Sequence, residues 1–326
     1  MIQATICLLA AMLAWTVPAR AEEIAVAQYG ATTSAMPWAV ALEKGFFQQS
    51  GADITAIRAS AGGSADIRNM IAGGLPYAES APGAVLAAVQ NGADVRIVNE
   101  CVHTNANDVW VTMPNSAVRS LADIKGKRLG FTTPQSTSEL LDHLLVAKMG
   151  LANSDVTYVS AGPFGAELTA LQAGGLDVAS IAEPLFTLNA GKFRALGWAR
   201  DTLEAFPATI GVVPTAVARS RPELIRGIIL AHRKAVEFMI DHRDESAAII
   251  ARVYRLPADM VKTVLDGLID HPSKGGVAYF GLGDIRPEGM DQLIAGLKSI
   301  NALDSDVPWR SLVDQSFLPP DLQRPL

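Results

Sequence analysis

The sequence predicts an α/β protein with two lobes and a ligand cleft between them. Segments that resemble strands and helices alternate with short loops from about residue 24 to residue 199, a pattern typical of parallel sheets covered by helices. The alternation falls into two blocks, each long enough for its own sheet. After about residue 220 the pattern becomes helical, so the last part of the chain adds cover to a sheet that is already complete.

Length and composition agree with two folded lobes. The chain has 326 residues, which is enough for two separate cores. Hydrophobic residues make up 49% and charged residues 18%, which excludes a disordered protein. The formal net charge of −6 argues against nucleic acid as a partner.

Residues 1–21 have the pattern of a signal peptide. Ala4 to Val17 is an apolar run that is too short to span a bilayer, and Ala19-Arg20-Ala21 is a small-x-small cleavage sequence. We therefore expect cleavage after Ala21 and export of the rest. Cleavage would leave Cys101 as a single cysteine, which cannot form an internal disulfide.

The first block predicts one sheet and its helices. The expected strands are Ile24–Gln28, Asp53–Ala59, Tyr77–Ser80 and Val95–Glu100. The expected helices are Trp38–Lys44 after Pro37, one that opens at residues 61–64 and closes at Gly73-Gly74, and one from Pro82 to Asn91.

The second block predicts another sheet. Its expected strands are Asp108–Met113, Arg128–Thr132, Val156–Ala161, Asp177–Ala182, Phe193–Ala199 and Gly211–Ala218, with helices after Ser136 and over Ala166–Gln172. We expect the chain to cross between lobes near Asp108–Met113 and Gly211–Ala218. Lobe 1 would then comprise residues 22–113 and 212–326, and lobe 2 residues 114–211.

The C-terminal part predicts helices that return to lobe 1. Ser220 and Glu223 have the spacing of a capping box, which would open a helix to about Asp241. Further helices are expected over Ala247–Tyr254, Pro257–Ile269 and Pro287–Ile300, before an irregular tail from Val307.

One helix start stands out in the second block. Ser136 is followed by Glu139 at capping-box spacing, Leu140, Leu141, Leu144 and Leu145 recur at helical spacing, and Gly150 ends the pattern. The first turn of such a helix presents N–H groups that attract anions. An ordinary capped helix without a ligand is the alternative.

Several motifs in order resemble one family. Pro37–Ala41 with Glu43–Phe47, Gly62-Gly63 with Ala72–Gly74, Leu121–Leu151, Ala170–Ala179, Glu183-Pro184 and Leu312–Leu318 look like segments of the nitrate/sulfonate/taurine solute-binding proteins of ABC transporters, which are similar to thiamine-pyrimidine synthases. The segment Gly74–Ser80 departs from the family pattern because it lacks the usual Asp.

The resemblance implies a type II periplasmic binding protein fold. It also implies that a monomer in the periplasm captures a small solute by lobe closure and delivers it to an inner-membrane ABC permease and its ATPase. No cofactor, metal site or catalytic residue is expected.

Candidate ligand contacts lie at carboxyl ends of strands and at helix starts. In lobe 1 they are Gln28, Tyr29, Trp38, Gly62, Gly63, Ser64, Ser80, His103 and Asn105, and in lobe 2 they are Thr132, Thr133, Gln135, Ser136, Thr137, Phe164 and Glu183. Five of these residues also have a structural alternative. Ser64 and Ser136 could be helix caps only, and Trp38 could belong to the core. Glu183 could end a strand, and His103 could lie in a surface loop.

The charge of these loops limits the ligand. They contain no Lys or Arg but do contain Glu79, Glu100, Asp108 and Glu183, which disfavours a dianion such as phosphate. A sulfonate-like monoanion or a taurine-like zwitterion fits, the latter because a carboxylate could hold its ammonium. A thiamine-precursor pyrimidine or aromatic acid stacked on Tyr29, Trp38 or Phe164 is the alternative.

Other classes of function remain possible from the sequence. Cys101 and His103 are two residues apart and would share one face of a continued strand, and a thiol beside an imidazole is a known nucleophile arrangement. A desulfinase-like enzyme that uses this pair is the alternative, because such enzymes are similar in fold. A metal-dependent pyrimidine synthase is disfavoured because the chain has no Cys cluster. A sensory or tripartite-carrier subunit is the third class.

Overall fold

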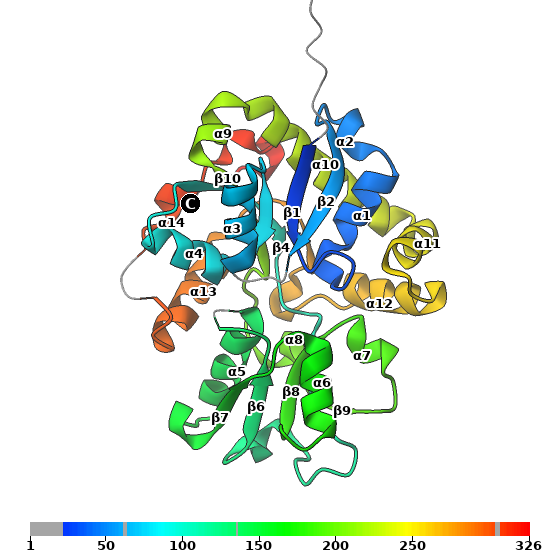
Figure 1. The fold of residues 1–326 in the computed structure, drawn as a ribbon, viewed down its shortest axis with the longest axis vertical. Helices are drawn as coiled ribbons and strands as arrows, with labels where there is room; N and C mark the ends of the chain where they lie inside the picture. Colours follow the sequence, from blue (N-terminus) through cyan, green and yellow to red (C-terminus); the bar gives the residue numbers. More distant parts are fainter. Residues whose placement is uncertain (1–21, 61–63, 135, 304–306) are drawn as a thin grey trace, which may run out of the picture.

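The molecule consists of two α/β lobes connected by two short segments. A computed structural model describes residues 22–60, 64–134, 136–303 and 307–326. Figure 1 shows lobe 1, with the N-terminal strands and the C-terminal helices, above the smaller lobe 2, which is mostly green. The predicted two-lobed α/β fold is therefore confirmed. Within the described ranges, no helix is long and apolar enough to cross a membrane.

Lobe 1 is built on a six-stranded sheet. Its strand order is β11-β4-β10-β3-β1-β2. The strands are β1 (Glu22–Ala27), β2 (Ile54–Ser60), β3 (Ala78–Ser80), β4 (Val95–Val102), β10 (Thr209–Pro214) and β11 (Phe280–Gly283). β1 is parallel to β2 and β3, whereas β10 is antiparallel to both β3 and β4. The strands β1 to β4 therefore all point the same way.

Lobe 2 is built on a five-stranded sheet of order β7-β6-β8-β5-β9. The strands are β5 (Asp108–Thr112), β6 (Arg128–Phe131), β7 (Thr157–Ser160), β8 (Val178–Ala182) and β9 (Arg194–Trp198). β6 is parallel to β7 and β8, and β5 is antiparallel to β8 and β9. Each sheet thus contains both parallel and antiparallel strands, whereas the sequence predicted parallel sheets.

One antiparallel strand in each sheet, β10 in lobe 1 and β5 in lobe 2, marks where the chain enters that lobe. Residues 103–107 connect β4 of lobe 1 to β5 of lobe 2, and residues 203–208 lead back to β10. We call these the first and second crossing segments. A strand that enters a lobe from the cleft has its amino end at the cleft. The parallel strands of the same sheet have their carboxyl ends at the cleft. The predicted lobe boundaries, after residues 113 and 211, are therefore a few residues late, because β5 belongs to lobe 2 and all of β10 to lobe 1.

Helices cover both faces of the sheets. They are α1 (Met36–Glu43), α2 (Phe46–Gln49), α3 (Ser64–Gly73), α4 (Pro82–Gln90), α5 (Thr137–Lys148), α6 (Phe164–Gln172), α7 (Leu185–Leu188), α8 (Ala199–Thr202), α9 (Thr215–Ser220), α10 (Pro222–Asp241), α11 (Arg243–Tyr254), α12 (Ala258–Asp270), α13 (Pro287–Ser299) and α14 (Trp309–Leu312).

Alternate residues of each strand supply the cores on the two faces. Ile24 and Val26 of β1 join a core with α1, α10, α11 and α12, while Ala25 between them joins the core with α3, α4 and α13. That second core continues into lobe 2 through Phe206, Leu140 and Leu141. Apolar packing therefore crosses the boundary between the lobes on the side where α13 meets α5 (Figure 1).

In the C-terminal part, one local prediction is wrong and one strand was not predicted. Ser220 ends α9 and donates a hydrogen bond to the carbonyl of Ala216, so the cap of α10 is Arg221 and there is no capping box with Glu223. The strand β11, which completes the lobe 1 sheet, was not predicted, because Phe280–Gly283 is short and contains two glycines.

Candidate functional site

A pocket lies between the lobes and is bounded by both crossing segments. It encloses about 700 Å³, counting its open mouth. Its walls are Ala27, Gln28, Thr32, Ser34, Ala81, Asn105, Asn107, Asp108, Thr132, Thr133, Ser136, Thr137, Ser138, Phe164, Ala182, Ala208, Thr209 and Tyr279. These residues come from lobe 1, from lobe 2 and from the segments between them, so a ligand here would contact all three.

The start of α5 forms a wall rich in hydroxyl groups. The Oγ of Ser136 accepts a hydrogen bond from the backbone N–H of Glu139 at 3.3 Å, which confirms the predicted cap. Ser138 Oγ lies 3.0 Å from both Ser136 Oγ and Thr132 Oγ1, and it accepts the N–H of Thr132. The hydroxyls are thus fixed around the first turn, whose N–H groups carry partial positive charge. Gly150, at φ +71°, follows the C-terminal end of α5 as predicted.

The lobe 1 wall comes from the loop that follows β1. Gln28 has φ 48°, in the left-handed region, and its N–H donates to the carbonyl of Ser60 at the end of β2. Thr32 and Ser34 share a hydrogen bond of 3.0 Å between their hydroxyls. Tyr279 also lines the pocket, and its hydroxyl is held by a 2.8 Å hydrogen bond to Thr33. This wall is polar and uncharged.

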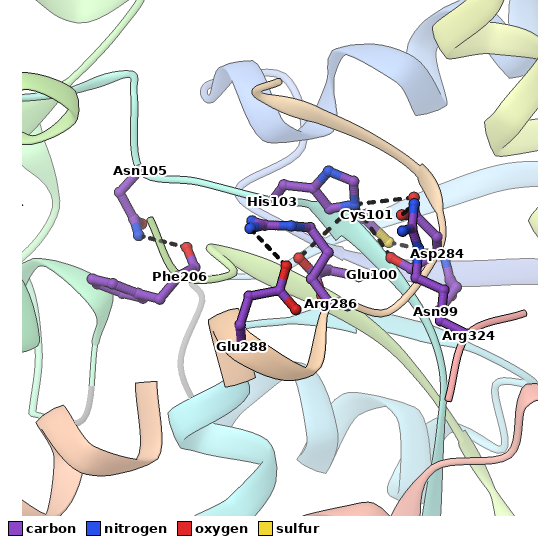
Figure 2. Close-up of polar contacts among 10 residues, drawn as sticks. All are labelled: Asn99, Glu100, Cys101, His103, Asn105, Phe206, Asp284, Arg286, Glu288 and Arg324. Atoms are coloured by element: carbon purple, nitrogen blue, oxygen red, sulfur yellow. Dashed lines mark hydrogen bonds and ion pairs between the residues drawn. The ribbon is translucent and has the colours of Figure 1, made fainter. Parts of the chain in front are cut away.

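The first crossing segment and the start of β5 form the third wall. Asn105 donates from Nδ2 to the carbonyl of Phe206 at 3.2 Å, which ties the two crossing segments together (Figure 2). Asn107 accepts the N–H of Glu183 with its backbone carbonyl. Asp108 is the only acidic residue among the described residues that line the pocket, and burial raises its pKa to about 8. The pocket walls in the described part of the chain include no Lys or Arg.

Seven predicted site residues line this pocket. They are Gln28, Asn105, Thr132, Thr133, Ser136, Thr137 and Phe164. Gly62, Gly63 and Gln135 lie outside the described residues, and the side chain of Ser64 does too.

Trp38, Tyr29 and Ser80 are placed elsewhere. Trp38 is fully buried, donates its indole N–H to Glu79 and packs in parallel on Phe47. Tyr29 packs edge-on against Tyr254, with ring centroids 6.2 Å apart. Ser80 is buried and donates a 2.8 Å hydrogen bond to Asp66. Trp38 is therefore a core residue, which was the structural alternative to a ligand contact.

Glu183 closes a local turn. Its carboxylate accepts hydrogen bonds from the N–H and the hydroxyl of Thr187, at 3.1 and 2.8 Å. Burial raises its pKa, and the hydrogen bonds from Thr187 partly oppose that rise. It is not among the residues that line the pocket.

His103 belongs to a buried polar network beside the first crossing segment. Figure 2 shows its ring between Glu100 and Asp284, and Nε2 lies 3.3 Å from Asp284 Oδ1 and 3.9 Å from Glu100 Oε1. Arg324 contacts the other oxygen of Asp284 at 2.8 Å. Burial alone would lower the pKa of His103, but the hydrogen bond and charges of these carboxylates raise it. His103, which was predicted to contact the ligand, thus contacts carboxylates of the protein.

Cys101 is part of the lobe 1 core. Its side chain is fully buried, and its Sγ lies 3.3 Å from both Tyr77 Oη and Asn99 Nδ2. Burial raises the pKa of the thiol well above its usual value. A protonated, inaccessible thiol is a poor nucleophile.

The sequence reasoning missed several pocket residues for one topological reason. Asn107, Asp108 and Thr209 lie at the amino ends of β5 and β10, whereas the predicted contacts were placed at the carboxyl ends of strands and at helix starts. The crossing strands run opposite to their neighbours, so it is their amino ends that face the cleft. Recognising the direction of the crossings would have found them. Ala27, Thr32, Ser34, Ala81, Ser138, Ala182, Ala208 and Tyr279 were also missed.

Metal binding finds no support in the described ranges. No group of three or more His, Cys, Asp or Glu residues there could hold a metal ion.

The sequence matches one family and one curated relative. The sequence model of the family described as NMT1/THI5 like matches residues 32–246. A protein of Escherichia coli (strain K12), whose name marks it as a candidate aliphatic-sulfonate-binding protein, is 26% identical over 177 residues. The matched region spans about half of each protein, 54% of this chain and 54% of the relative.

Solved structures share the fold over nearly the whole chain. The periplasmic aliphatic sulphonate binding protein SsuA of Escherichia coli has a TM-score of 0.74 at 18% identity, covering 90% of this chain and 92% of that one. The alkanesulfonate-binding protein SsuA of Xanthomonas axonopodis pv. citri, bound to MOPS, has a TM-score of 0.73 at 20% identity, covering 90% and 97%. The desulfurization enzyme DSZB is less similar, with a TM-score of 0.60 at 15% identity, covering 91% and 97%.

Proposed function

Because this chain belongs to the NMT1/THI5-like family, we propose that it is the periplasmic solute-binding subunit of an ABC importer. Its fold is that of periplasmic binding proteins such as SsuA. The pocket between the lobes, with walls from both, suits a protein that encloses a small solute. The likeness to a sulfonate-binding relative supports the same class of cargo.

The proposed ligand is a small organic anion or zwitterion of the sulfonate kind. One observation carries this proposal: the described residues that line the pocket include the hydroxyl-rich first turn of α5 and no Lys or Arg. N–H and hydroxyl donors satisfy a diffuse monoanion, whereas a dianion would need Lys or Arg to offset its desolvation. Ser136, Ser138 and Thr132 would supply the hydroxyls.

A neutral heteroaromatic ligand has weaker support. Of the three aromatic residues expected to stack on it, only Phe164 lines the pocket, since Trp38 and Tyr29 pack elsewhere. Thiamine-precursor pyrimidines and aromatic acids therefore rank second.

Lobe closure would provide the capture mechanism. A solute that contacts α5 of lobe 2 and Gln28 or Ser34 of lobe 1 gains all these contacts only when the lobes are close. It therefore binds the closed arrangement better and shifts the population towards it. The closed monomer would then deliver the solute to an inner-membrane permease driven by its ATPase.

Export would proceed through cleavage after Ala21. The sheet of lobe 1 begins directly after this point: Glu22 opens β1, its N–H donates to Asp53, and its carboxylate pairs with Arg221. N-terminal sequencing of the exported protein should begin at Glu22.

Ligand-dependent melting tests the proposed cargo. The mature chain from Glu22 is melted with alkanesulfonates, taurine, nitrate, aromatic carboxylates and thiamine pyrimidines. A true ligand at 100 times its Kd adds about 2.7 kcal/mol to the free energy of unfolding, which raises Tm visibly. A rise only with pyrimidines would favour the second ligand class, and no rise with any compound would overturn the proposal.

An enzyme of the desulfinase kind is the proposal of another class, kept because DSZB shares the fold. Its support is reduced by the burial of Cys101 and by the engagement of His103 with Asp284. Cys101→Ala should therefore leave ligand binding unchanged. If the wild-type protein converted a sulfinate and the Cys101→Ala variant did not, the enzyme proposal would be favoured instead.

A further inference from the structure

The third wall of the pocket is made of hydrogen-bond acceptors. We call Asn105, Asn107 and Asp108 the acceptor cradle. Asn105 and Asn107 lie in the first crossing segment, Asp108 begins β5, and all three line the pocket. All three are buried, with 5 to 7% of their surface exposed.

Two acceptors of the cradle have no hydrogen-bond partner in the described part of the chain. The Nδ2 of Asn105 donates to Phe206, which fixes the amide and leaves Oδ1 as the group that needs a donor. Asn105 Oδ1 and Asn107 Oδ1 are both buried without a hydrogen-bond partner. Buried polar atoms rarely stay unsatisfied, so these oxygens point to a donor that a ligand brings.

The charge of the cradle specifies the kind of donor. Asp108 adds a carboxyl group, and no Lys or Arg is among the described residues that line the pocket. The nearby ionisable groups behind it, Asp142 of α5 and Glu167 of α6, are also carboxyls and are fully or almost fully buried. An ammonium carries three N–H donors and one positive charge, which match three acceptors of which one is a carboxyl.

The strand order sets the distance between the cradle and the anion-binding turn. Thr132 follows β6 and Asp108 begins β5, and these strands are separated by β8. Two inter-strand spacings amount to about 10 Å. Hydrogen bonds of about 2.9 Å at each end leave about 4 Å between the two charged groups of a bridging ligand. A link of two or three carbon atoms covers that distance.

We propose that the acceptor cradle is a second subsite, which holds the ammonium of a short ω-aminosulfonate whose sulfonate lies at the first turn of α5. This inference rests on the proposed function, because it needs the anion held at α5. It goes further in naming the ligand class: a zwitterion is selected over a plain alkanesulfonate of the same length.

Matched ligand pairs test the cradle by titration calorimetry. Taurine is compared with ethanesulfonate, and 3-aminopropanesulfonate with propanesulfonate, on the mature chain. We expect each amino compound to bind at least tenfold more tightly than its partner. The Asp108→Asn variant should lose most of this preference.

Two further variants complete the test. Asp201→Asn makes the same chemical change at a lobe 2 carboxylate whose side chain is 70% exposed, and it should keep the preference. Asn107→Ala removes one acceptor without removing charge and should reduce the preference severalfold, which covers the case that Asp108→Asn does not fold.

The outcomes separate this inference from the proposed function. Equal affinities for taurine and ethanesulfonate in the wild-type chain would overturn the cradle and leave the proposed function standing. A preference for taurine that both Asp108→Asn and Asn107→Ala retain would also overturn it. Failure of every sulfonate to bind would overturn both proposals.

Discussion

The hydroxyl of Ser136 has two roles that a single substitution can separate. It caps α5 through the N–H of Glu139, and it lines the pocket. Ser136→Ala should lower the free energy of unfolding by about 1 kcal/mol, as expected for a lost cap. It should also weaken sulfonate binding severalfold, because one donor to the anion is lost.

Ser120→Ala is the matched control for that variant. Ser120 precedes a short 3-10 helix at residues 121–124 of lobe 2, donates its hydroxyl to Asp123 at 3.1 Å and does not line the pocket. Its replacement should cost stability without changing Kd, as measured by denaturant unfolding and calorimetry. If both variants left Kd unchanged, Ser136 would be a cap and nothing more.

Trp38 should affect stability and not binding. Trp38→Phe keeps an aromatic ring in the core but removes the hydrogen bond to the buried carboxyl of Glu79. We expect a loss of about 1–3 kcal/mol in unfolding free energy with an unchanged Kd. Phe164→Leu, at the pocket wall, should weaken ligand binding and leave the unfolding free energy nearly unchanged. A large loss of affinity in Trp38→Phe would return Trp38 to the binding site.

The buried carboxyl of Asp108 should make stability depend on pH. Its pKa is about 8 in the folded protein because of burial, and about 4 in the unfolded chain. Between these values the unfolded state binds fewer protons, so stability falls as pH rises, by up to about 1.4 kcal/mol per pH unit from this group. Asp142 and Glu167, with pKa values raised by burial, add to the fall.

Comparing variants isolates the contribution of Asp108. Asp108→Asn should flatten the decline in Tm between pH 4 and pH 8, and the exposed Asp201→Asn should leave it as in the wild type. Identical pH profiles for the wild type and Asp108→Asn would show that Asp108 ionises normally and that its surroundings are wetter than the structure implies.

At the scale of elements, α13 of lobe 1 and α5 of lobe 2 make close contact. A Cβ on Gly296 would lie 3.2 Å from Leu144 Cδ2, so this glycine lets the two helices approach. Because the contact joins different lobes, Gly296→Val should hold them apart rather than unfold either one. We expect lower ligand affinity and a larger radius of gyration in small-angle scattering.

Gly267 of α12 provides the control for a helical glycine. A Cβ there would meet nothing within 4 Å. Gly267→Ala should therefore leave both affinity and radius unchanged, and stability equal or higher by up to about 1 kcal/mol. Unaltered affinity in Gly296→Val would mean that the contact between α13 and α5 does not limit closure.

Elements with strong local signals were predictable from the sequence. The cap at Ser136, the leucine spacing and Gly150 together located α5, because all three act within one or two turns. Ser220 and Glu223 had the same spacing, yet Arg221 intervenes as the cap, since Ser220 belongs to the preceding α9. Spacing alone cannot show which of two adjoining helices a residue joins.

At the scale of the whole molecule, the two lobes and the cleft followed from the alternation of strands and helices, but the walls of the cleft followed only in part. Side chains after β1 and β6, such as Gln28 and Thr132, were predictable because parallel strands present their carboxyl ends. Asn107 and Asp108 were not, since their place depends on a strand that pairs antiparallel with a distant partner. Local sequence patterns do not show such pairing, and only the direction in which the chain crosses between the lobes indicates it.

The most direct test of the whole account is hydrogen–deuterium exchange of the mature chain with and without the sulfonate that raises Tm most. A solute enclosed between the lobes should slow exchange together in three regions: residues 132–140 at the start of α5, residues 104–109 at the first crossing segment, and residues 28–34 of lobe 1. Protection confined to one lobe, or to surfaces away from these regions, would contradict capture in the cleft.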